Sequence, residues 1–207
     1  IELHESHEFC EELFNECPNH VSLNGYFQTE KYFKNAEKLI RLDFRFKKHI
    51  IEEVQSHFKE YLDQKPVCIL VRDFNPEFDY PNCENNHINV SLEFYEKAIE
   101  SLGKDRTYIV CSNSIDLCKK QKLFQGDNFI FNEVVPEEIY KGHFDLCLMS
   151  MCQDFIVSNS TFGWWGAWLG NGEGKRVILP SPWYGPGLSH ISVDDLYPDG
   201  WEKIEWK

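Results

Sequence analysis

The sequence contains no apolar run of membrane-spanning length, no signal peptide, no internal repeat and no low-complexity tract. Basic residues are also few: 21 Lys and Arg stand against 34 Asp and Glu, which gives a formal net charge of −13. A protein that binds a nucleic-acid backbone needs a basic surface to match its phosphates. The sequence therefore predicts no membrane insertion within this chain and no nucleic-acid partner.

Metal-binding patterns are missing as well. The eight cysteines form no Cys-x-x-Cys pair and show no zinc-ligand spacing with the eight histidines. No Asp-x-Asp motif occurs near an expected strand end, and the tandem Asp194-Asp195 is typical of a solvated surface. Cys68, Cys111 and Cys147 lie inside apolar segments, which favours reduced, buried thiols. We therefore expect no metal site and a protein of a reducing compartment.

The residues that are present indicate a folded α/β protein. Apolar residues make up 42% of the 207 residues and aromatic residues 15%, enough for a substantial core. Strands are expected at 67–71, 107–111, 128–131, 154–157 and 176–179, and helices at 92–102, at 115–122, from Pro136 through Met151 and from Trp164. This alternation predicts a Rossmann-like domain at residues 66–207, with a parallel sheet covered on both faces. Residues 1–65, which carry a helical stripe over 50–62, are expected to form a mostly helical N-terminal segment.

The most informative stretch is the sequence SNSTFGWWGAW at residues 158–168. It follows the apolar run 154–157 and opens into a tryptophan-rich helical pattern. A strand, a hydroxyl-rich turn and a helix N-terminus direct free backbone N–H groups and the positive end of the helix dipole at one spot. Ser158, Ser160 and Thr161 add hydroxyl groups there, so the stretch predicts a site for phosphate or another anion. The simpler interpretation, a capped helix with its tryptophans in the core, stays open.

Two separate parts of the chain carry a resemblance to a known family. Residues 148–152 (LMSMC) and 155–169 (FIVSNSTFGWWGAWL) resemble the signature of the α-1,2-fucosyltransferases, glycosyltransferase family eleven. Residues 25–33 (GYFQTEKYF) are similar to a segment that this family carries ahead of its donor-binding domain. The resemblance extends from Gly25 to Trp206. It implies the nucleotide-sugar-binding half of a GT-B fold, with an N-terminal part that is reduced or truncated.

The resemblance also implies a chemistry. An acceptor hydroxyl attacks the anomeric carbon of a nucleotide sugar as the diphosphate leaves, with inversion and without a metal ion. The implied partners are the donor GDP-fucose and a glycan acceptor, and no further cofactor. Ser158, Asn159, Ser160 and Thr161 would bind the diphosphate.

The sequence departs from the family after the first strand of the nucleotide domain. The family has His-x-Arg-Arg-x-Asp there, whereas residues 70–74 read LVRDF. Arg72 still offers a forked donor to a diphosphate, although an ion pair with a neighbour is the alternative. Asp73 is expected to orient Arg72 or to act as a general base, and Glu77 and Asp79 are further base candidates. Arg72 and Asp73 are therefore the candidate catalytic residues.

A second departure follows the next strand, where the family has Ser-Asp-Asp and residues 112–114 read SNS. Ser112 and Asn113 are expected to contact the donor base, but the lost carboxylate weakens the case for guanine and opens a UDP-sugar as an alternative donor. A turn that caps the following helix is the simpler interpretation. Further along, Trp183 and Tyr184 lie in a Pro- and Gly-rich loop and offer aromatic faces to a sugar, with packing as the alternative.

Together these features predict an inverting, metal-independent glycosyltransferase that moves a sugar, with fucose from GDP-fucose as the first choice, to a glycan hydroxyl. One alternative is the same fold with a different donor, such as a UDP-pentose. Another is a catalytically silent sugar- or nucleotide-binding module. A soluble, cytoplasmic protein is expected, with a lumenal fragment of a membrane-anchored enzyme as the alternative.

Overall fold

The computed structural model describes residues 2–4, 8–77, 79–81 and 83–206. Its centre is a six-stranded parallel sheet with the order β5-β4-β3-β6-β7-β8. The strands are β3 (Val67–Val71), β4 (Tyr108–Ser112), β5 (Phe129–Phe131), β6 (Asp154–Val157), β7 (Val177–Ser181) and β8 (Glu202–Glu205). The central strands are continuous apolar runs because both of their faces are covered. The predicted Rossmann-like α/β fold is therefore confirmed.

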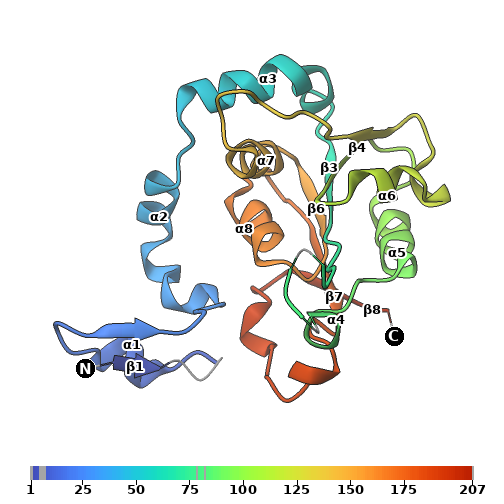
Figure 1. Ribbon diagram of the computed structural model, residues 1–207. Coiled ribbons are helices and arrows are strands. Elements are labelled where there is room, and N and C mark those ends of the chain that lie inside the picture. Colours follow the sequence, from blue (N-terminus) through green and yellow to red (C-terminus); the bar gives the residue numbers. More distant parts are fainter. Residues whose placement is uncertain (1, 5–7, 78, 82, 207) are drawn as a thin grey trace.

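Helices lie on both sides of this sheet (Figure 1). One core cluster unites α3 (Lys48–Leu62), α7 (Lys141–Ser150) and α8 (Thr161–Leu169) with one set of alternate strand residues, which includes Cys68 and Phe155. The opposite cluster packs α5 (Leu92–Leu102) and α6 (Ile115–Lys119) against the other set, which includes Ile69 and Ile156. The two clusters follow from the two-residue period of side chains along each strand.

Three sequence expectations need correction. The helix expected from Pro136 begins only at Lys141, because Tyr140 has an extended backbone with ψ 124° and breaks the helical path. The helix expected over 115–122 ends at Lys119, and Lys122–Phe124 form a separate 3-10 turn. Strand β8 was not predicted at all. Its residues, Glu-Lys-Ile-Glu, pack only one face of an edge strand and so contain no apolar run.

The chain before residue 66 contains more than helices. Strands β1 (Glu2–His4) and β2 (Ser22–Asn24) pair in parallel, and α1 (Glu11–Glu16) lies between them in sequence. The 3-10 turns Glu30–Tyr32 and Lys34–Ala36 lead into α2 (Glu37–Asp43). Figure 1 shows this part beside the sheet domain, while α3 lies against the domain itself. Ile50, Val54 and Phe58 of α3 belong to the sheet's core, and the division at residue 65 stays a prediction.

The described helices include none that is both long enough and apolar enough to span a bilayer. All eight cysteines are free thiols, and Cys68, Cys111 and Cys147 are buried as predicted.

Helix α8 approaches the sheet closely, because glycine occupies its inner face. A Cβ atom at Gly163 would clash with the side chains of Leu70 and Val157. A Cβ at Gly166 would lie 3.1 Å from the Cβ of Met149 on α7, tighter than ordinary packing. The two glycines of the tryptophan-rich stretch therefore set how deeply this helix seats.

The carboxyl end of α8 is held by two cations from outside the helix. Lys175 Nζ donates to the carbonyls of Ala167 at 2.6 Å and Gly170 at 2.7 Å. Arg41, on α2, donates to the carbonyls of Trp168 at 2.7 Å and Leu169 at 3.1 Å. These carbonyls have no partner within the helix, and positive charge is favourable at this end. The carboxyl end of α8 is thus held by residues outside the helix.

Gly163→Ala should destabilise the fold by about 1–3 kcal/mol, because the added methyl group overpacks the contact with Leu70 and Val157. Urea denaturation followed by circular dichroism measures the change in the free energy of unfolding. Thr161→Ala, an exposed position on the same helix, is the control and should change it by less than about 0.5 kcal/mol. Equal effects of the two variants would contradict the proposed close contact.

Candidate functional site

A cavity of about 690 Å³ lies at the carboxyl ends of β3, β4 and β5, next to the first residues of α7 and α8. We call it the sheet-end pocket. It is lined by Leu70, Val71, Arg72, Cys111, Ser112, Asn113, Ile115, Asp116, Asn132, Glu133, Val135, Tyr140, Lys141, Gly142, Asp145, Ser160 and Phe162. In open parallel sheets, ligands bind outside the carboxyl ends of the strands, and this pocket has that position and a ligand-sized volume.

The N-terminus of α8 opens on this pocket. Ser160 is the N-cap residue, with an extended backbone (φ −135°, ψ 125°) and no capping hydrogen bond from its side chain. The first bond of the helix runs from Trp164 N to Ser160 O at 2.9 Å, so the N–H groups of residues 161–163 precede the helical ladder. With Ser160 and Phe162 in the pocket wall, these donors and the helix dipole favour an anion there.

The structure separates the four hydroxyl and amide residues of the turn. Ser160 lines the sheet-end pocket, and Thr161 is exposed beside it. Ser158 is fully buried, and its Oγ accepts a hydrogen bond from Arg72 N at 3.1 Å. Asn159 is 3% exposed, and its Nδ2 donates to Ile88 O at 2.9 Å and Trp183 O at 3.0 Å. These contacts of Ser158 and Asn159 fix the turn against neighbouring segments of the chain.

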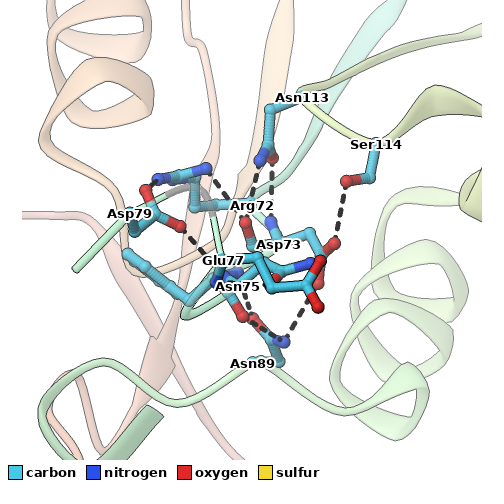
Figure 2. A network of polar contacts seen from close by, with 9 residues as sticks. Arg72, Asp73, Asn75, Glu77, Asp79, Asn89, Asn113 and Ser114 are labelled. Carbon is cyan, nitrogen blue, oxygen red and sulfur yellow. Dashed lines mark hydrogen bonds and ion pairs between the residues drawn. The ribbon is translucent and has the colours of Figure 1, made fainter. Parts of the chain in front are cut away.

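Arg72 follows β3 and belongs to a network of polar contacts (Figure 2). Its Nη2 forms an ion pair with Asp79, and its Nη1 donates to Asp73 O at 2.9 Å. The guanidinium also lies over the ring of Phe74, 4.7 Å from the centroid. A guanidinium has five N–H donors, and these contacts use two of them. The ion pair with a neighbour, weighed from the sequence as the alternative role, is therefore present, and the other guanidinium N–H donors have no partner among the described residues.

Asp73 and Asn113 hold each other in position (Figure 2). Asn113 Oδ1 accepts from Asp73 N at 2.9 Å, and Asn113 Nδ2 donates to Asp73 O at 2.8 Å. The Asp73 carboxylate accepts from Asn89 Nδ2 at 3.0 Å and Ser114 Oγ at 2.8 Å. Ser112 Oγ accepts from Ser114 N at 2.9 Å. The sequence-predicted residues 72, 73, 112 and 113 thus meet in space, joined by bonds between the ends of β3 and β4.

Sequence reasoning missed the residues that follow β5. Lys141 Nζ donates to Asp145 Oδ1 at 2.8 Å, and Asn132 Nδ2 donates to the same oxygen at 2.7 Å. Asn132 is 3% exposed, and its Oδ1 has no partner among the described residues. Glu133 also lines the pocket and forms an ion pair with Lys119. The position of Asn132-Glu133 directly after an expected strand was the available signal, since carboxyl ends of parallel strands share one edge.

A second cavity, of about 540 Å³, lies beside the first, and we call it the aromatic pocket. It is lined by Tyr26, Phe27, Gln28, Thr29, Phe33, Thr161, Phe162, Trp164, Trp165, Trp183 and Leu196. Phe33 packs against Trp165 and Trp168 with ring centroids 5.3 Å apart in each pair. The two motif stretches that lie more than a hundred residues apart in sequence therefore line one cavity.

The tryptophans of α8 pack in the core, as the simpler interpretation predicted, and some of them also line a cavity. Trp164 and Trp168 are 6% and 3% exposed and belong to the core. Trp164 and Trp165 nevertheless present part of their rings to the aromatic pocket, as does Trp183, which is 2% exposed. Tyr184, the other aromatic residue singled out in that loop, donates its hydroxyl to Gln28 Oε1 at 2.8 Å.

The part of the chain that the structure describes holds no group of three or more His, Cys, Asp or Glu side chains able to bind a metal ion.

His87 is a titratable group that the sequence did not single out. Its ring stacks on Phe74, with centroids 5.0 Å apart, and packs near Tyr80 and Tyr184. Burial, and then the Arg72 guanidinium, lower the pKa of His87 below its usual 6.5, and Asp79 offsets part of this effect. The side chain is therefore neutral at pH 7 and adds no positive charge beside Arg72.

The lowered pKa of His87 predicts a loss of stability in mild acid. The unfolded chain binds a proton on this residue near pH 6.5, whereas the folded chain binds it only at lower pH. The free energy of unfolding should therefore fall as pH drops below about 6.5, and His87→Gln should remove this part of the pH dependence. An NMR titration of the His87 ring in the folded protein checks the cause, and a pKa at or above 6.5 would contradict it.

Comparison with known proteins identifies a family and relatives of this chain. Residues 5–205 match the family model Glycosyl transferase family 11. The chain is 25% identical to an alpha-1,2-colitosyltransferase of Escherichia coli, over 97% of this chain and 68% of that protein. It is 31% identical to the O-antigen biosynthesis glycosyltransferase WbnK of Escherichia coli, over 55% of this chain and 38% of that protein.

Among solved structures, POFUT1 in complex with GDP-fucose superposes with a TM-score of 0.50 and 15% identity, over 81% of this chain and 57% of that one. The chain thus spans a little over half the length of this neighbour, and the likeness concerns the fold alone. It agrees with the predicted nucleotide-binding half of a GT-B fold. The match of the family model over nearly the whole sequence shows that the chain belongs to glycosyl transferase family 11.

Proposed function

We propose that the chain transfers a sugar from a nucleotide diphosphate donor to a glycan hydroxyl, with GDP-fucose as the first donor to test. The observation that carries this proposal is the meeting of the α8 N-terminus and Arg72 at one ligand-sized cavity. Membership of the family supports the reaction class. The activity for which the colitosyltransferase relative is named makes a colitose donor the second candidate.

The diphosphate would lie at the first turn of α8. Backbone N–H groups of residues 161–163 and the Ser160 hydroxyl are the nearest donors there, and Arg72 supplies a fixed positive charge. Lys141 is a second cation in the wall of the pocket. As the bond between the anomeric carbon and the diphosphate oxygen breaks, these groups stabilise the charge that develops on the leaving oxygen. This chain's own donors then carry out the role without a metal ion.

The base would contact the part of the pocket formed after β4 and β5. Asn113 is engaged with the backbone of Asp73, but the carboxylates of Asp116 and Glu133 line the same cavity. A carboxylate accepts two hydrogen bonds side by side, and guanine offers adjacent N1 and N2 donors, whereas uracil offers one N–H. Glu133 is already paired with Lys119, so Asp116 is the acid that supports guanine over uracil.

The acceptor hydroxyl would attack the anomeric carbon from the face opposite the diphosphate, with inversion. Its proton passes to a carboxylate base as the new bond forms. Asp73 accepts two side-chain hydrogen bonds, and its backbone carbonyl accepts from Arg72, which supports a positioning role. Of the three base candidates, Glu77 is the one whose side chain is exposed and outside the hydrogen bonds of Figure 2.

Arg72→Ala should weaken GDP binding by about 1.5–3 kcal/mol, since it removes a charge-assisted contact to the diphosphate. Calorimetric titration with GDP and UDP measures this loss and the base preference together. Arg45→Ala, which removes an exposed arginine outside the pocket, is the matched control and should leave GDP affinity unchanged.

Three results would count against the proposal. Unchanged GDP affinity in the Arg72 variant would remove this residue from the site. Selective binding of UDP would replace the guanine donor with a uridine one. Binding of GDP-fucose without transfer or hydrolysis would favour a catalytically silent binding module.

A further inference from the structure

We propose that the aromatic pocket binds the acceptor as a neutral saccharide and presents its hydroxyl toward the sheet-end pocket. This inference rests on the proposed function and adds the place and chemical class of the second substrate. Phe162 lines both cavities, so the two share a wall. Their volumes, about 690 and 540 Å³, each fall in the range of a site for one small ligand. A transfer between two substrates needs two such sites with adjoining ends.

The charges of the two pockets differ in the way that this assignment requires. Arg72, Lys141, Asp116, Glu133 and Asp145 line the sheet-end pocket. Among the described residues, no Asp, Glu, His, Lys or Arg lines the aromatic pocket. A diphosphate buried there would find no positive side chain to offset the loss of its hydration, whereas an uncharged sugar needs no such partner. The aromatic pocket therefore suits a neutral saccharide and not the charged half of the donor.

The walls of the aromatic pocket supply the surfaces that a sugar ring packs against. Tyr26 is 76% exposed at its edge, which leaves most of its ring accessible. Trp165 is stacked between Phe33 and Phe44, with centroids 5.3 and 5.4 Å away and ring planes within 20° and 3° of parallel. This stacking covers both faces of the indole, so Trp165 forms a rigid edge of the wall, and the exposed ring of Tyr26 is the aromatic face that would pack against the C–H face of a pyranose.

Gln28 gives the pocket a directed polar group. Its Oε1 accepts from Tyr184 OH at 2.8 Å, which orients the amide and leaves the Nε2 donors without a partner among the described residues. Thr161, an exposed residue, adds a hydroxyl group to the pocket lining. An apolar cavity with a few placed polar groups is the usual form of a specific small-ligand site.

The pocket is held open by bonds between its walls. Trp168 Nε1 donates to Glu30 Oε2 at 3.2 Å, which ties α8 to the turn that follows Gln28. Trp164 Nε1 donates to Leu196 O at 2.8 Å, which joins two further residues of the pocket lining. The site is therefore formed before a ligand arrives.

Saturation-transfer NMR on the GDP-loaded chain tests the proposal with methyl β-galactoside, lactose and methyl β-glucuronide as probes. The two neutral saccharides should receive saturation and the acidic one should not. Tyr26→Ala and Gln28→Ala should each weaken neutral-saccharide binding by about tenfold, which corresponds to about 1.4 kcal/mol. Calorimetry should show GDP affinity within about twofold of the unchanged protein in both variants. Leu39→Ala, an exposed apolar position on α2 outside both pockets, should alter neither affinity.

Displacement of the saccharides by GDP, equal saturation of the glucuronide, or no saturation of any neutral probe would overturn the proposal. So would full saccharide binding in both variants. A drop in affinity for GDP-fucose but not for GDP in the Tyr26 variant would assign the pocket to the donor's own sugar. If the proposed function is wrong, the unchanged chain will not bind GDP. Saccharide binding to the chain without GDP would then still test the aromatic pocket.

Discussion

One hydrogen bond couples the parts of the candidate donor site, from Arg72 N to Ser158 Oγ at 3.1 Å. It joins the end of β3 to the end of β6, while Ser158 N donates to Leu70 O at 3.1 Å in the opposite direction. The guanidinium-bearing residue and the turn before α8 therefore cannot move independently. Because Ser158 is fully buried, no water competes for this bond. A charged donor and a helix N-terminus are thus preorganised around the same point before any ligand is present.

The tryptophan-rich helix serves packing and site formation at once. Its glycines let it seat against β3, β6 and α7, and its carboxyl end is fixed by Lys175 and Arg41. Two of its indole N–H groups donate to segments far away in sequence. A buried indole needs such a partner, so the same side chains that fill the core also bring the residue 26–33 segment to the site.

The electrostatics of the site are local. The chain carries a formal net charge of −13, and the sheet-end pocket itself contains three acidic side chains. Arg72 is paired with Asp79 and Lys141 with Asp145, so neither cation is bare. Under the proposed function, directed N–H groups would attract a diphosphate over a short range, in a field whose long-range sign is unfavourable. Neutral His87 adds no charge to this balance.

The sequence predicted some strands and helices correctly and missed others, for physical reasons. The runs at Val67, Tyr108 and Phe155 identified buried parallel strands, because a strand covered on both faces must be apolar throughout. The edge strand β8 escaped notice since only one of its faces is packed. The helix that begins at Lys141 was predicted to begin at Pro136, because proline permits a helix start but does not enforce one.

Some of the site residues named from the sequence could be placed at one edge of the sheet because each follows a strand. They are Arg72, Ser112, Asn113 and Ser160. The sequence by itself thus determined the fold class and the family, and it singled out the turn before α8 as the candidate anion site, all of which depend on local pattern. Only the tertiary structure decided that Ser158 and Asn159 face inward, that Arg72 is paired with Asp79, and that residues 26–33 complete a second pocket. Those outcomes depend on contacts between segments far apart in the chain, and no local period or propensity encodes such contacts.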